Sequence, residues 1–276
     1  MTELPEVEMI VRKLRPHLAG RTFTEVVVLW ERIVTQPGAT AFCRSLTGAQ
    51  VQDVGRRGKY LLFPLDTGQT WLVHLRMTGK FLLHSAREED GDPHVRARFH
   101  LDDGTWLLFS DTRKFGRFYL VDDPQEMVGT LGPEPLATDF TAAQLAERLA
   151  GRRGELKRLL LDQHFIAGLG NIYVSEALWR AGIHPRRVAG TLTREEAGRL
   201  HAAIVGVLTE GIANGGATLG DGQYVYPDGG LGRQQEHLAV YERAGEHCPR
   251  CGAPVERIVQ GQRSTYLCPI CQKLTA

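Results

Sequence analysis

The sequence lacks any apolar run close to the roughly 20 residues that a membrane-spanning helix needs. Its opening segment, Met1–Glu8, is acidic and has no basic and then apolar signal region, so we expect a cytosolic protein outside the membrane. The sequence also lacks an excess of charge of one sign, because its 33 basic and 32 acidic side chains give a formal net charge of +1. Total charge therefore gives no sign of nucleic-acid binding, which has to be sought in the positions of the basic residues.

The length of 276 residues favours two domains. Hydrophobic residues make up 42% and charged residues 24% of the chain, which is typical of a globular protein and excludes a disordered or fibrous one. Lysine is scarce, with six residues against 27 arginines, so the position of each lysine is informative.

The five cysteines divide into a group of four and a single residue. The spacing C-x2-C-x16-C-x2-C suits one tetrahedral zinc ion, and all four positions are thiols, so no place is left for a catalytic water. The alternative, a disulfide framework, is disfavoured in a cytosolic chain. We predict one structural Zn²⁺ held by Cys248, Cys251, Cys268 and Cys271. Cys43 is expected to be a small buried hydrophobic residue.

The first half of the chain predicts one helix followed by many short strands. Apolar residues recur at three- and four-residue spacing from Val7 to Leu18, after Pro5, and Gly20 ends this pattern. Alternating segments separated by turn signals then predict strands. These segments are Thr22–Trp30, Val51–Val54, Tyr60–Leu65, Thr70–Leu75, Val95–Leu101, Thr105–Ser110 and Arg117–Val121. Residues 1–121 are therefore expected to form a β-sandwich or barrel with an N-terminal helix attached.

The second half predicts helices and then the cysteine module. Residues 122–135 are irregular and are expected to be a linker. Helical periodicity then covers Ala142–Leu149, Leu156–Leu161, Ile172–Ala181 and Arg194–Ile212. Residues 214–232 are rich in Gly and Tyr and are expected to form a loop too fluid to be core. We predict a helical domain over 136–235 that includes this loop, and a zinc-finger domain over 236–276.

One candidate anion site lies before the helix at Ile172. The stretch Ile166–Tyr173 places two glycines and Asn171 there; Asn171 suits the N-cap, and the glycines let backbone amides approach a ligand such as DNA phosphate. The alternative is an ordinary glycine-rich turn, which this stretch taken alone favours.

A second candidate site joins two strands at Asp111–Gly116. Arg113 and Lys114 followed by Phe115 at a hairpin tip resemble an intercalating finger, with the cations on phosphate or base edges and the ring between bases. The alternative is a solvated turn with Phe115 in the core. Met77, on the strand segment that begins at His74, would complement Phe115 as a flexible apolar wedge.

Other charged residues, each taken alone, do not distinguish a functional role from an ordinary structural one. Lys59 is expected at a hairpin turn. Arg263 lies between the cysteine pairs, where a ribbon hairpin turns, and would either insert into a minor groove, grip phosphate or remain solvated. Glu3, Glu6 and Glu8 crowd the first helix, where acids ordinarily complement the helix dipole.

In combination these motifs are specific, and the chain resembles the formamidopyrimidine-DNA glycosylase family over essentially its full length. The matching segments are Glu3–Glu8, Arg57–Lys59, His74–Met77, Arg113–Gly116, Leu131–Leu136, Gly168–Pro185 and the four-cysteine ribbon with Gln262-Arg263. The related endonuclease VIII branch, which prefers oxidised pyrimidines, matches less well in the opening segment and the Arg-Lys-Phe finger. The resemblance implies an α+β fold: an N-terminal helix with a two-layer β-sandwich, a helix–two-turn–helix domain and a four-cysteine zinc ribbon.

The resemblance also implies a bifunctional DNA glycosylase and AP lyase of base-excision repair. Such an enzyme acts as a monomer on double-stranded DNA, flips out and excises 8-oxoguanine or formamidopyrimidines, and cuts at the abasic site by β,δ-elimination. After Met1 is removed, the new N-terminal amine attacks C1′ and forms an imine, because an α-amine titrates near neutral pH. Catalytic roles then fall to Thr2, Glu3, Glu6 and Lys59, and contacts with DNA to His74, Met77, Arg113, Lys114, Phe115, Lys157, Asn171, Tyr173 and Arg263. The resemblance also makes residues 218–232 the lid over the everted base, in a bacterial protein used at the nucleoid.

One position departs from the family pattern. The family nucleophile is a proline directly after Met1, and here that residue is Thr2. A threonine supplies a primary amine without a fixed ring, and its imine need not carry a charge, so we expect weaker glycosylase and lyase activity. Three hypotheses follow: an active oxidised-purine glycosylase, a lesion-binding protein with little catalysis, and a plain zinc-ribbon protein. A plain zinc-ribbon protein is disfavoured, because it would need none of Glu3, Glu6, Lys59 and the Arg113–Phe115 finger.

Overall fold

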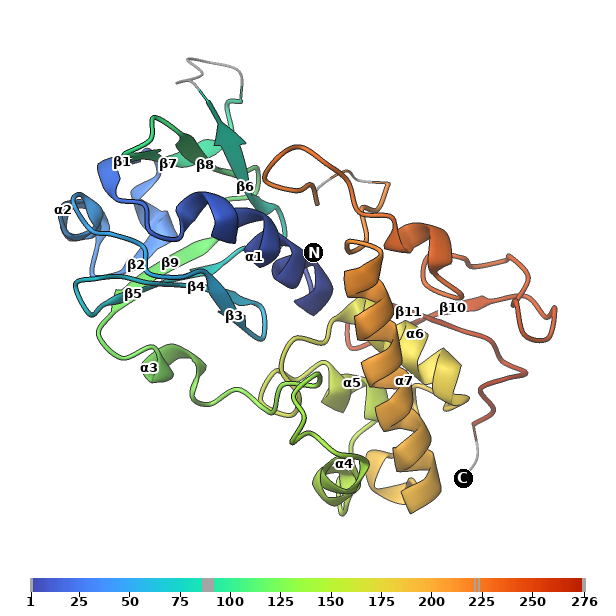
Figure 1. Cartoon of the computed structure of the whole chain (residues 1–276). Helices are drawn as coiled ribbons and strands as arrows, with labels where there is room; N and C mark the ends of the chain where they lie inside the picture. The colour runs from blue at the N-terminus through green and yellow to red at the C-terminus, as the bar shows by residue number, and fades with distance from the viewer. Residues whose placement is uncertain (1, 86–91, 221, 223, 275–276) are drawn as a thin grey trace. The chain divides into compact units, whose positions relative to one another are not determined.

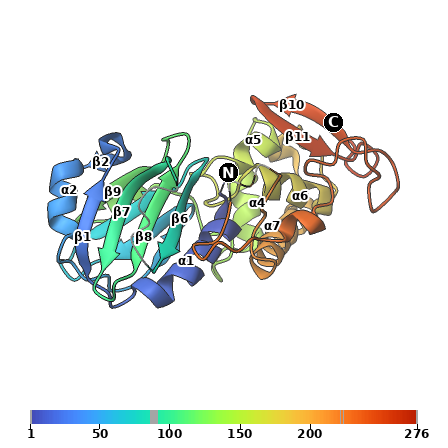
Figure 2. The ribbon, with the colours of Figure 1, turned by 90° about the horizontal axis from the view of Figure 1, so that it is seen from above.

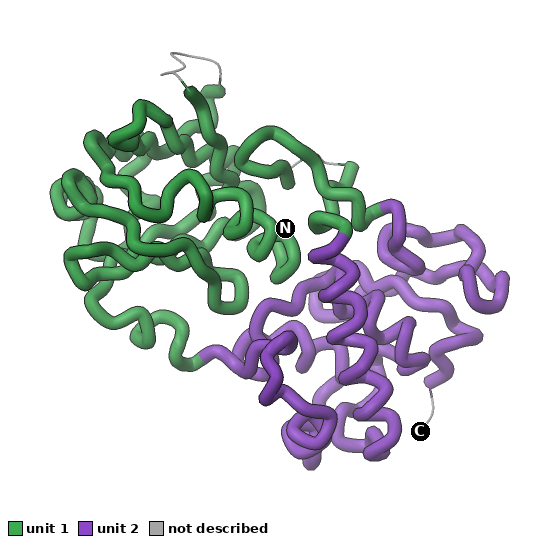
Figure 3. Tube along the Cα trace, viewed as in Figure 1, with its two compact units in different colours: residues 1–130, 214–235 green, residues 131–213, 236–276 purple. Residues whose placement is uncertain are grey.

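The computed structural model describes residues 2–85, 92–220, 222 and 224–274. Contacts divide the chain into two compact units (Figure 3): residues 1–130 with 214–235, and residues 131–213 with 236–276. The expected division placed residues 214–232 in the helical domain, whereas the contacts group them with the first unit. None of the helices in the described residues is long and apolar enough to cross a membrane.

The first unit begins with helix α1, Leu4–Leu18, as the apolar spacing predicts. Pro5 lies in its first turn, where the missing amide hydrogen is not needed. The apolar face, from Val7 to Leu18, is buried in the core of this unit. The helix thus fixes the N-terminal end of the chain against packed side chains.

Two sheets follow α1 and form a sandwich (Figure 1 and Figure 2). The four-stranded sheet is antiparallel and has the order β1-β7-β8-β6; its strands are Phe23–Val28, Val95–Leu101, Trp106–Asp111 and Gly79–His84. The five-stranded sheet has the order β2-β9-β5-β4-β3; its strands are Val34–Gln36, Arg117–Val121, Thr70–His74, Tyr60–Pro64 and Gly55–Arg57. Only β2 and β9 pair in parallel among these described strands. This is the expected two-layer sandwich.

Aromatic rings from both sheets fill the space between the layers. The Trp71 ring on β5 lies 4.6 Å from the Phe99 ring on β7, and Phe118 on β9 lies 4.9 Å from Phe109 on β8, between centroids. All four side chains are fully buried. Such ring pairs add stabilisation beyond the burial of their area, so the frame that carries the strand ends is rigid.

Several elements of the first unit do not follow from the sequence pattern. Strands β2, β3 and β6 and helix α2, Ala39–Leu46, are not predicted, and helix α3, Gln125–Val128, lies in the expected linker. The predicted strand Val51–Val54 is wrong, because only an isolated bridge at Val51 forms there. Cys43, on α2, is half-buried against the core, so the expectation of a buried residue holds only in part. These elements are short, and short segments carry little periodicity.

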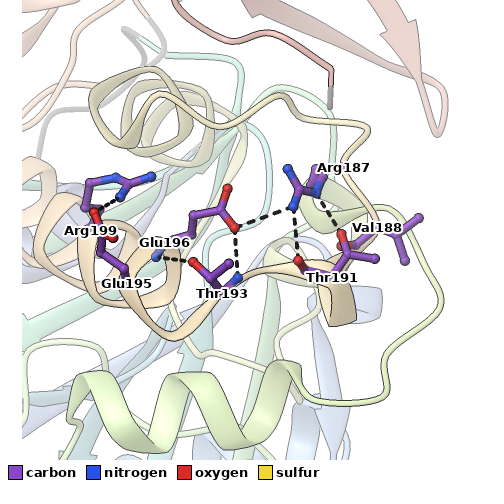
Figure 4. A network of polar contacts seen from close by, with 7 residues as sticks. All are labelled: Arg187, Val188, Thr191, Thr193, Glu195, Glu196 and Arg199. Atoms are coloured by element: carbon purple, nitrogen blue, oxygen red, sulfur yellow. Dashed lines mark hydrogen bonds and ion pairs between the residues drawn. The ribbon is translucent and has the colours of Figure 1, made fainter. Parts of the chain in front are cut away.

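The described part of the second unit contains four α-helices and a two-stranded ribbon. The helices are α4, α5, α6 and α7, over Ala142–Leu149, Leu156–Leu160, Asn171–Ala181 and Arg194–Ala213, and the ribbon strands are β10 and β11, over Glu256–Gln260 and Arg263–Leu267. Thr193 caps α7: its hydroxyl accepts from the Glu196 amide at 3.1 Å, and the Glu196 carboxylate accepts from the Thr193 amide at 2.8 Å (Figure 4). The same carboxylate meets Arg187 at 3.5 Å and ties the preceding turn to the helix.

Candidate functional site

The start of α1 gathers three buried polar residues. Thr2 is 8% exposed, and Glu3 and Glu6 are each 1% exposed. Glu6 Oε2 accepts the backbone N–H of Glu3 at 2.8 Å, and Glu6 Oε1 accepts the backbone N–H of Ala217 at 2.9 Å. Carboxylates are buried this deeply only with such partners. Glu6 therefore fixes the backbone at Glu3 and joins it to residues 214–235.

Residues 214–232 are irregular in their described part, as expected for a loop, but Tyr224 belongs to the core of the first unit and Tyr226 packs against that core, so the prediction that the loop is too fluid to be core is wrong at these residues. Tyr224 is 5% exposed, and its hydroxyl donates to the Gly215 carbonyl at 3.0 Å. Gly216 has φ +81, and a Cβ there would lie 3.0 Å from Glu6 Cγ. Only glycine allows Glu6 and this segment to approach so closely. Asp221 and Gln223, within the expected lid, lie outside the described residues.

Lys59 lies in the two-residue turn between β3 and β4, as predicted. In the register of β4 and β5, the next residue, Tyr60, is opposite His74, and the two rings are 4.8 Å apart between centroids. Burial first, and then the positive charges of Arg76 and Lys59, lower the pKa of His74 from 6.5 to about 3. His74 is therefore neutral near neutral pH.

A hydrogen bond also sets the orientation of the His74 ring. Its Nδ1 accepts the backbone N–H of Arg76 at 3.0 Å, so the ring hydrogen of the neutral form resides on Nε2. Arg76 has φ +59, an uncommon conformation for a residue with a side chain. Met77 follows in the turn after β5, so its predicted place on a strand is wrong by a few residues.

The Arg113–Phe115 segment links β8 to β9. These strands belong to different sheets, so the connection crosses the sandwich and is not the expected hairpin tip. Phe115 is 45% exposed, which excludes the alternative that places its ring in the core. The Arg113 guanidinium lies 4.8 Å from the Phe115 centroid, and the Lys114 ammonium lies 4.1 Å from the Trp30 centroid. The segment thus presents an exposed ring with one cation against it, and holds a second cation against Trp30.

Asp111 holds this segment in shape, a role that the sequence pattern does not indicate. Its carboxylate is fully buried and accepts the backbone N–H of Gly116 at 2.7 Å and that of Arg113 at 3.2 Å. The hydroxyl of Thr78 donates to the same group. An aspartate at a strand end is too common a feature to be singled out without its partners.

In the second unit, Asn171 is the first residue of α6, and the N-cap is Gly170, so the predicted N-cap is wrong by one residue. The Asn171 side chain instead donates from Nδ2 to the Ser264 carbonyl at 2.9 Å. This bond ties the beginning of α6 to strand β11. The Asn171 side chain thus bonds to the ribbon and does not cap its own helix.

Lys157 and Tyr173 lie deeper than sequence analysis expects for residues that contact DNA. Lys157 is 1% exposed and donates to Thr265 Oγ1 at 2.9 Å and to Ser175 Oγ at 3.2 Å. Tyr173 is fully buried; a Cβ at Gly211 would lie 2.6 Å from its ring. Their phosphate contacts stay predictions; the bonds of Lys157 support the ribbon, and the Tyr173 ring packs against α7.

Arg263 is exposed at the start of β11, next to the turn of the ribbon. Gly261 and Gln262, the two turn residues, both have positive φ, which is the geometry of a tight two-residue hairpin. The predicted position of Arg263 at this hairpin is confirmed. Ser264 and Thr265, which follow it, receive the bonds from Asn171 and Lys157.

The four cysteines of the ribbon converge. Their Sγ atoms all lie within 4.8 Å of one another; Cys251 to Cys268 measures 3.4 Å and Cys248 to Cys271 measures 3.9 Å. A tetrahedral zinc ion with bonds of about 2.3 Å to sulfur sets its ligands about 3.8 Å apart. The residues therefore fit a structural zinc ion, as the spacing predicts.

Comparisons with known proteins agree with this arrangement. Three family profiles match: the formamidopyrimidine-DNA glycosylase N-terminal domain over residues 1–118, its H2TH domain over 131–222, and the zinc finger found in FPG and IleRS over 245–274. Formamidopyrimidine-DNA glycosylases of Chloroflexus aggregans and Protochlamydia amoebophila are 48% and 44% identical to the chain; each alignment covers 99% of this chain, and 99% and 100% of the relative.

Solved structures are similar over the same extent. A complex of Lactococcus lactis Fpg with DNA containing an abasic site has a TM-score of 0.91 and 35% identity, and covers 99% of this chain and 100% of that one. A complex of the same protein with DNA containing Fapy-dG has a TM-score of 0.90 and 34% identity at the same coverage.

Proposed function

The chain belongs to the formamidopyrimidine-DNA glycosylase family, and on that premise we propose that it excises oxidised purines from duplex DNA and then cuts the strand at the abasic site. The relatives named above are formamidopyrimidine-DNA glycosylases by name, and the related structures hold DNA with an abasic site or Fapy-dG. The observation that carries the proposal for this chain is the buried, hydrogen-bonded start of α1 at Thr2 and Glu3.

In the proposed reaction the amine of Thr2, freed by removal of Met1, attacks C1′ of the damaged nucleotide. The C1′–N bond to the base breaks and the base leaves with a proton, the C1′–O4′ bond then breaks so that the sugar ring opens and O4′ takes up a proton, and an imine forms between Thr2 and C1′. β,δ-Elimination then breaks the C3′–O and C5′–O bonds and releases the strand ends. Glu3 transfers protons at the sugar, and Glu6 holds the backbone of Glu3. Lys59 binds phosphate and takes part in proton transfer. Zinc maintains the ribbon that presents Arg263 and supplies no chemistry.

The proposed DNA contacts come from both units. Phe115, Arg113 and Met77 fill the place of the everted nucleotide, with Arg113 toward the orphaned cytosine. Lys114, His74, Asn171 and Arg263 bind the backbone, with Lys157 and Tyr173 beneath them. Residues 218–232 cover the everted base and set the preference for the lesion.

A second function is favoured by one residue. Thr2 replaces the secondary amine of proline with a primary amine, so the chain could bind lesions and bend DNA with little catalysis. Both functions use the same binding residues, and the imine alone separates them.

Borohydride trapping on a duplex with 8-oxoguanine opposite cytosine tests the proposal. Borohydride reduces the imine to a permanent bond, and we expect an adduct that peptide mapping places on Thr2. Tight lesion-specific binding without an adduct would replace the enzyme with the binding protein. Absence of both would overturn the proposed function.

A further inference from the structure

Helix α6 ends against the cluster of cysteines, and its last turn carries Trp179. The indole Nε1 of Trp179 donates to Cys248 Sγ at 3.4 Å, within the range for a hydrogen bond to sulfur. The indole is half-buried and packs on a small cluster formed by Val240, Cys248, Val255 and Cys268. A tryptophan side chain from a helix is thus in contact with one of the four zinc ligands.

The first cysteine pair also reaches back to the helix. Arg250 lies between Cys248 and Cys251, and its guanidinium carbon is 4.4 Å from the centroid of the Trp179 ring. Its Nη2 donates to the carbonyl of Arg180 at 3.1 Å, near the end of α6. The indole is therefore enclosed by the loop whose sulfur it contacts, which limits the directions in which its N–H can point.

The second cysteine pair is tied to the same place. Gln272 Nε2 donates to the Ile183 carbonyl at 3.0 Å, and Gln272 Oε1 accepts the backbone N–H of Cys268 at 2.9 Å. Gln272 is 1% exposed, so this bridge is buried. Both cysteine pairs are thus fastened to the end of α6, and a side chain there can act on the metal.

We propose that Trp179 controls how firmly the zinc ion is held, through its hydrogen bond to the Cys248 sulfur. A hydrogen bond to a metal-bound thiolate orients the sulfur and stabilises its negative charge. Loss of such a partner typically weakens metal binding by about 10- to 100-fold. Because α6 starts at Asn171, which bonds to Ser264, the same helix connects zinc retention to the ribbon that carries Arg263. The proposal is independent of the reaction that the enzyme performs.

Replacement Trp179→Phe tests this, because phenylalanine keeps a ring for Arg250 and for the cluster but has no N–H. With the full chain loaded with zinc, release into a chromophoric chelator is followed over time. We expect release to be roughly tenfold faster in Trp179→Phe than in the wild type. The matched control Trp106→Phe changes a tryptophan of the first unit and should release zinc at the wild-type rate.

Substitution of cobalt for zinc separates the hydrogen bond from packing. The N–H lowers the energy of the sulfur lone pair, so its loss should move the thiolate-to-cobalt charge-transfer band to longer wavelength in Trp179→Phe. An unmoved band, or release at the wild-type rate, would overturn the proposal. If Trp179→Phe does not fold, replacement of Trp179 by 3-benzothienylalanine removes the N–H with the ring shape kept, and the same two readings apply.

Discussion

At the residue scale, we expect Thr2 to set how strongly the proposed enzyme catalyses. Its hydroxyl donates to the Arg76 carbonyl at 3.4 Å, a long bond that holds the residue only loosely. We expect Thr2→Pro to increase the borohydride-trapped adduct on an abasic duplex by roughly threefold or more at a fixed short time, because the ring fixes the amine and its iminium is always charged.

The matched control is Thr2→Val, which keeps the branched shape and the primary amine but removes the hydroxyl. Its trapping should stay near that of the wild type, since the hydroxyl is not the nucleophile. A lower yield of adduct with Thr2→Pro than with the wild type would contradict the view that the primary amine limits the reaction.

His74 gives the first unit a dependence on pH. Because its pKa is lowered from 6.5 to about 3, the folded state favours the neutral ring and the unfolded state takes up the proton first. The stabilisation is complete above pH 6.5 and is lost as the pH falls toward 3, by at most about 1.4 kcal/mol for each pH unit. Denaturant unfolding at pH 7 and at lower pH should thus show a smaller loss in His74→Gln than in the wild type.

The exposed His17 supplies the control for that experiment. His17→Gln removes a histidine from the surface of α1 and so controls for the loss of an imidazole as such. Equal acid sensitivity of His74→Gln and the wild type would mean that the ring is not buried in its neutral form.

At the element scale, the link between β8 and β9 should serve DNA and not the fold. Phe115 is 45% exposed, so Phe115→Ala should change the free energy of unfolding by no more than about 0.5 kcal/mol. Phe118, three residues on, is fully buried, and Phe118→Ala should cost about 3–5 kcal/mol. Affinity for a duplex with an abasic-site analogue should nevertheless fall clearly in Phe115→Ala, measured by fluorescence anisotropy. Unchanged affinity would show that the Phe115 ring does not contribute to DNA binding.

The elements show what could be predicted from the sequence. Long periodic segments such as α1 and α7 follow from their apolar spacing, and the cysteine spacing predicts the metal cluster. The N-cap at Asn171 is wrong because the backbone of β11 competes for its side chain. The expectation for residues 214–232 is wrong about burial at Tyr224, because a segment rich in glycine and tyrosine is typical of an exposed loop. The role of Asp111 could not be predicted, because it depends on hydrogen bonds from Thr78, 33 residues before it, and from Gly116, five residues after it.

At the scale of the whole molecule, the sandwich and the ribbon differ in what stabilises them. The first unit has a large core of aromatic rings between two sheets, whereas the ribbon of the second has a cluster of only four buried residues in its described part, two of them zinc ligands. So small a core cannot hold the ribbon by itself, and a structural zinc ion supplies about 10–16 kcal/mol of binding free energy in small zinc domains. Loss of zinc should therefore destabilise the second unit far more than the first.

Removal of zinc should consequently abolish DNA binding and leave the sandwich folded. After treatment with a chelator, affinity for a lesion duplex should fall by at least about tenfold, because Arg263, Asn171 and Lys157 depend on a formed ribbon. The near-ultraviolet signal of the aromatic core around Trp71 should persist, and zinc added back should restore binding. The imine would be lost only as a consequence, since no zinc-bound group takes part in it. Strand cleavage at the full rate by the zinc-free protein would show that the ribbon is not part of the site.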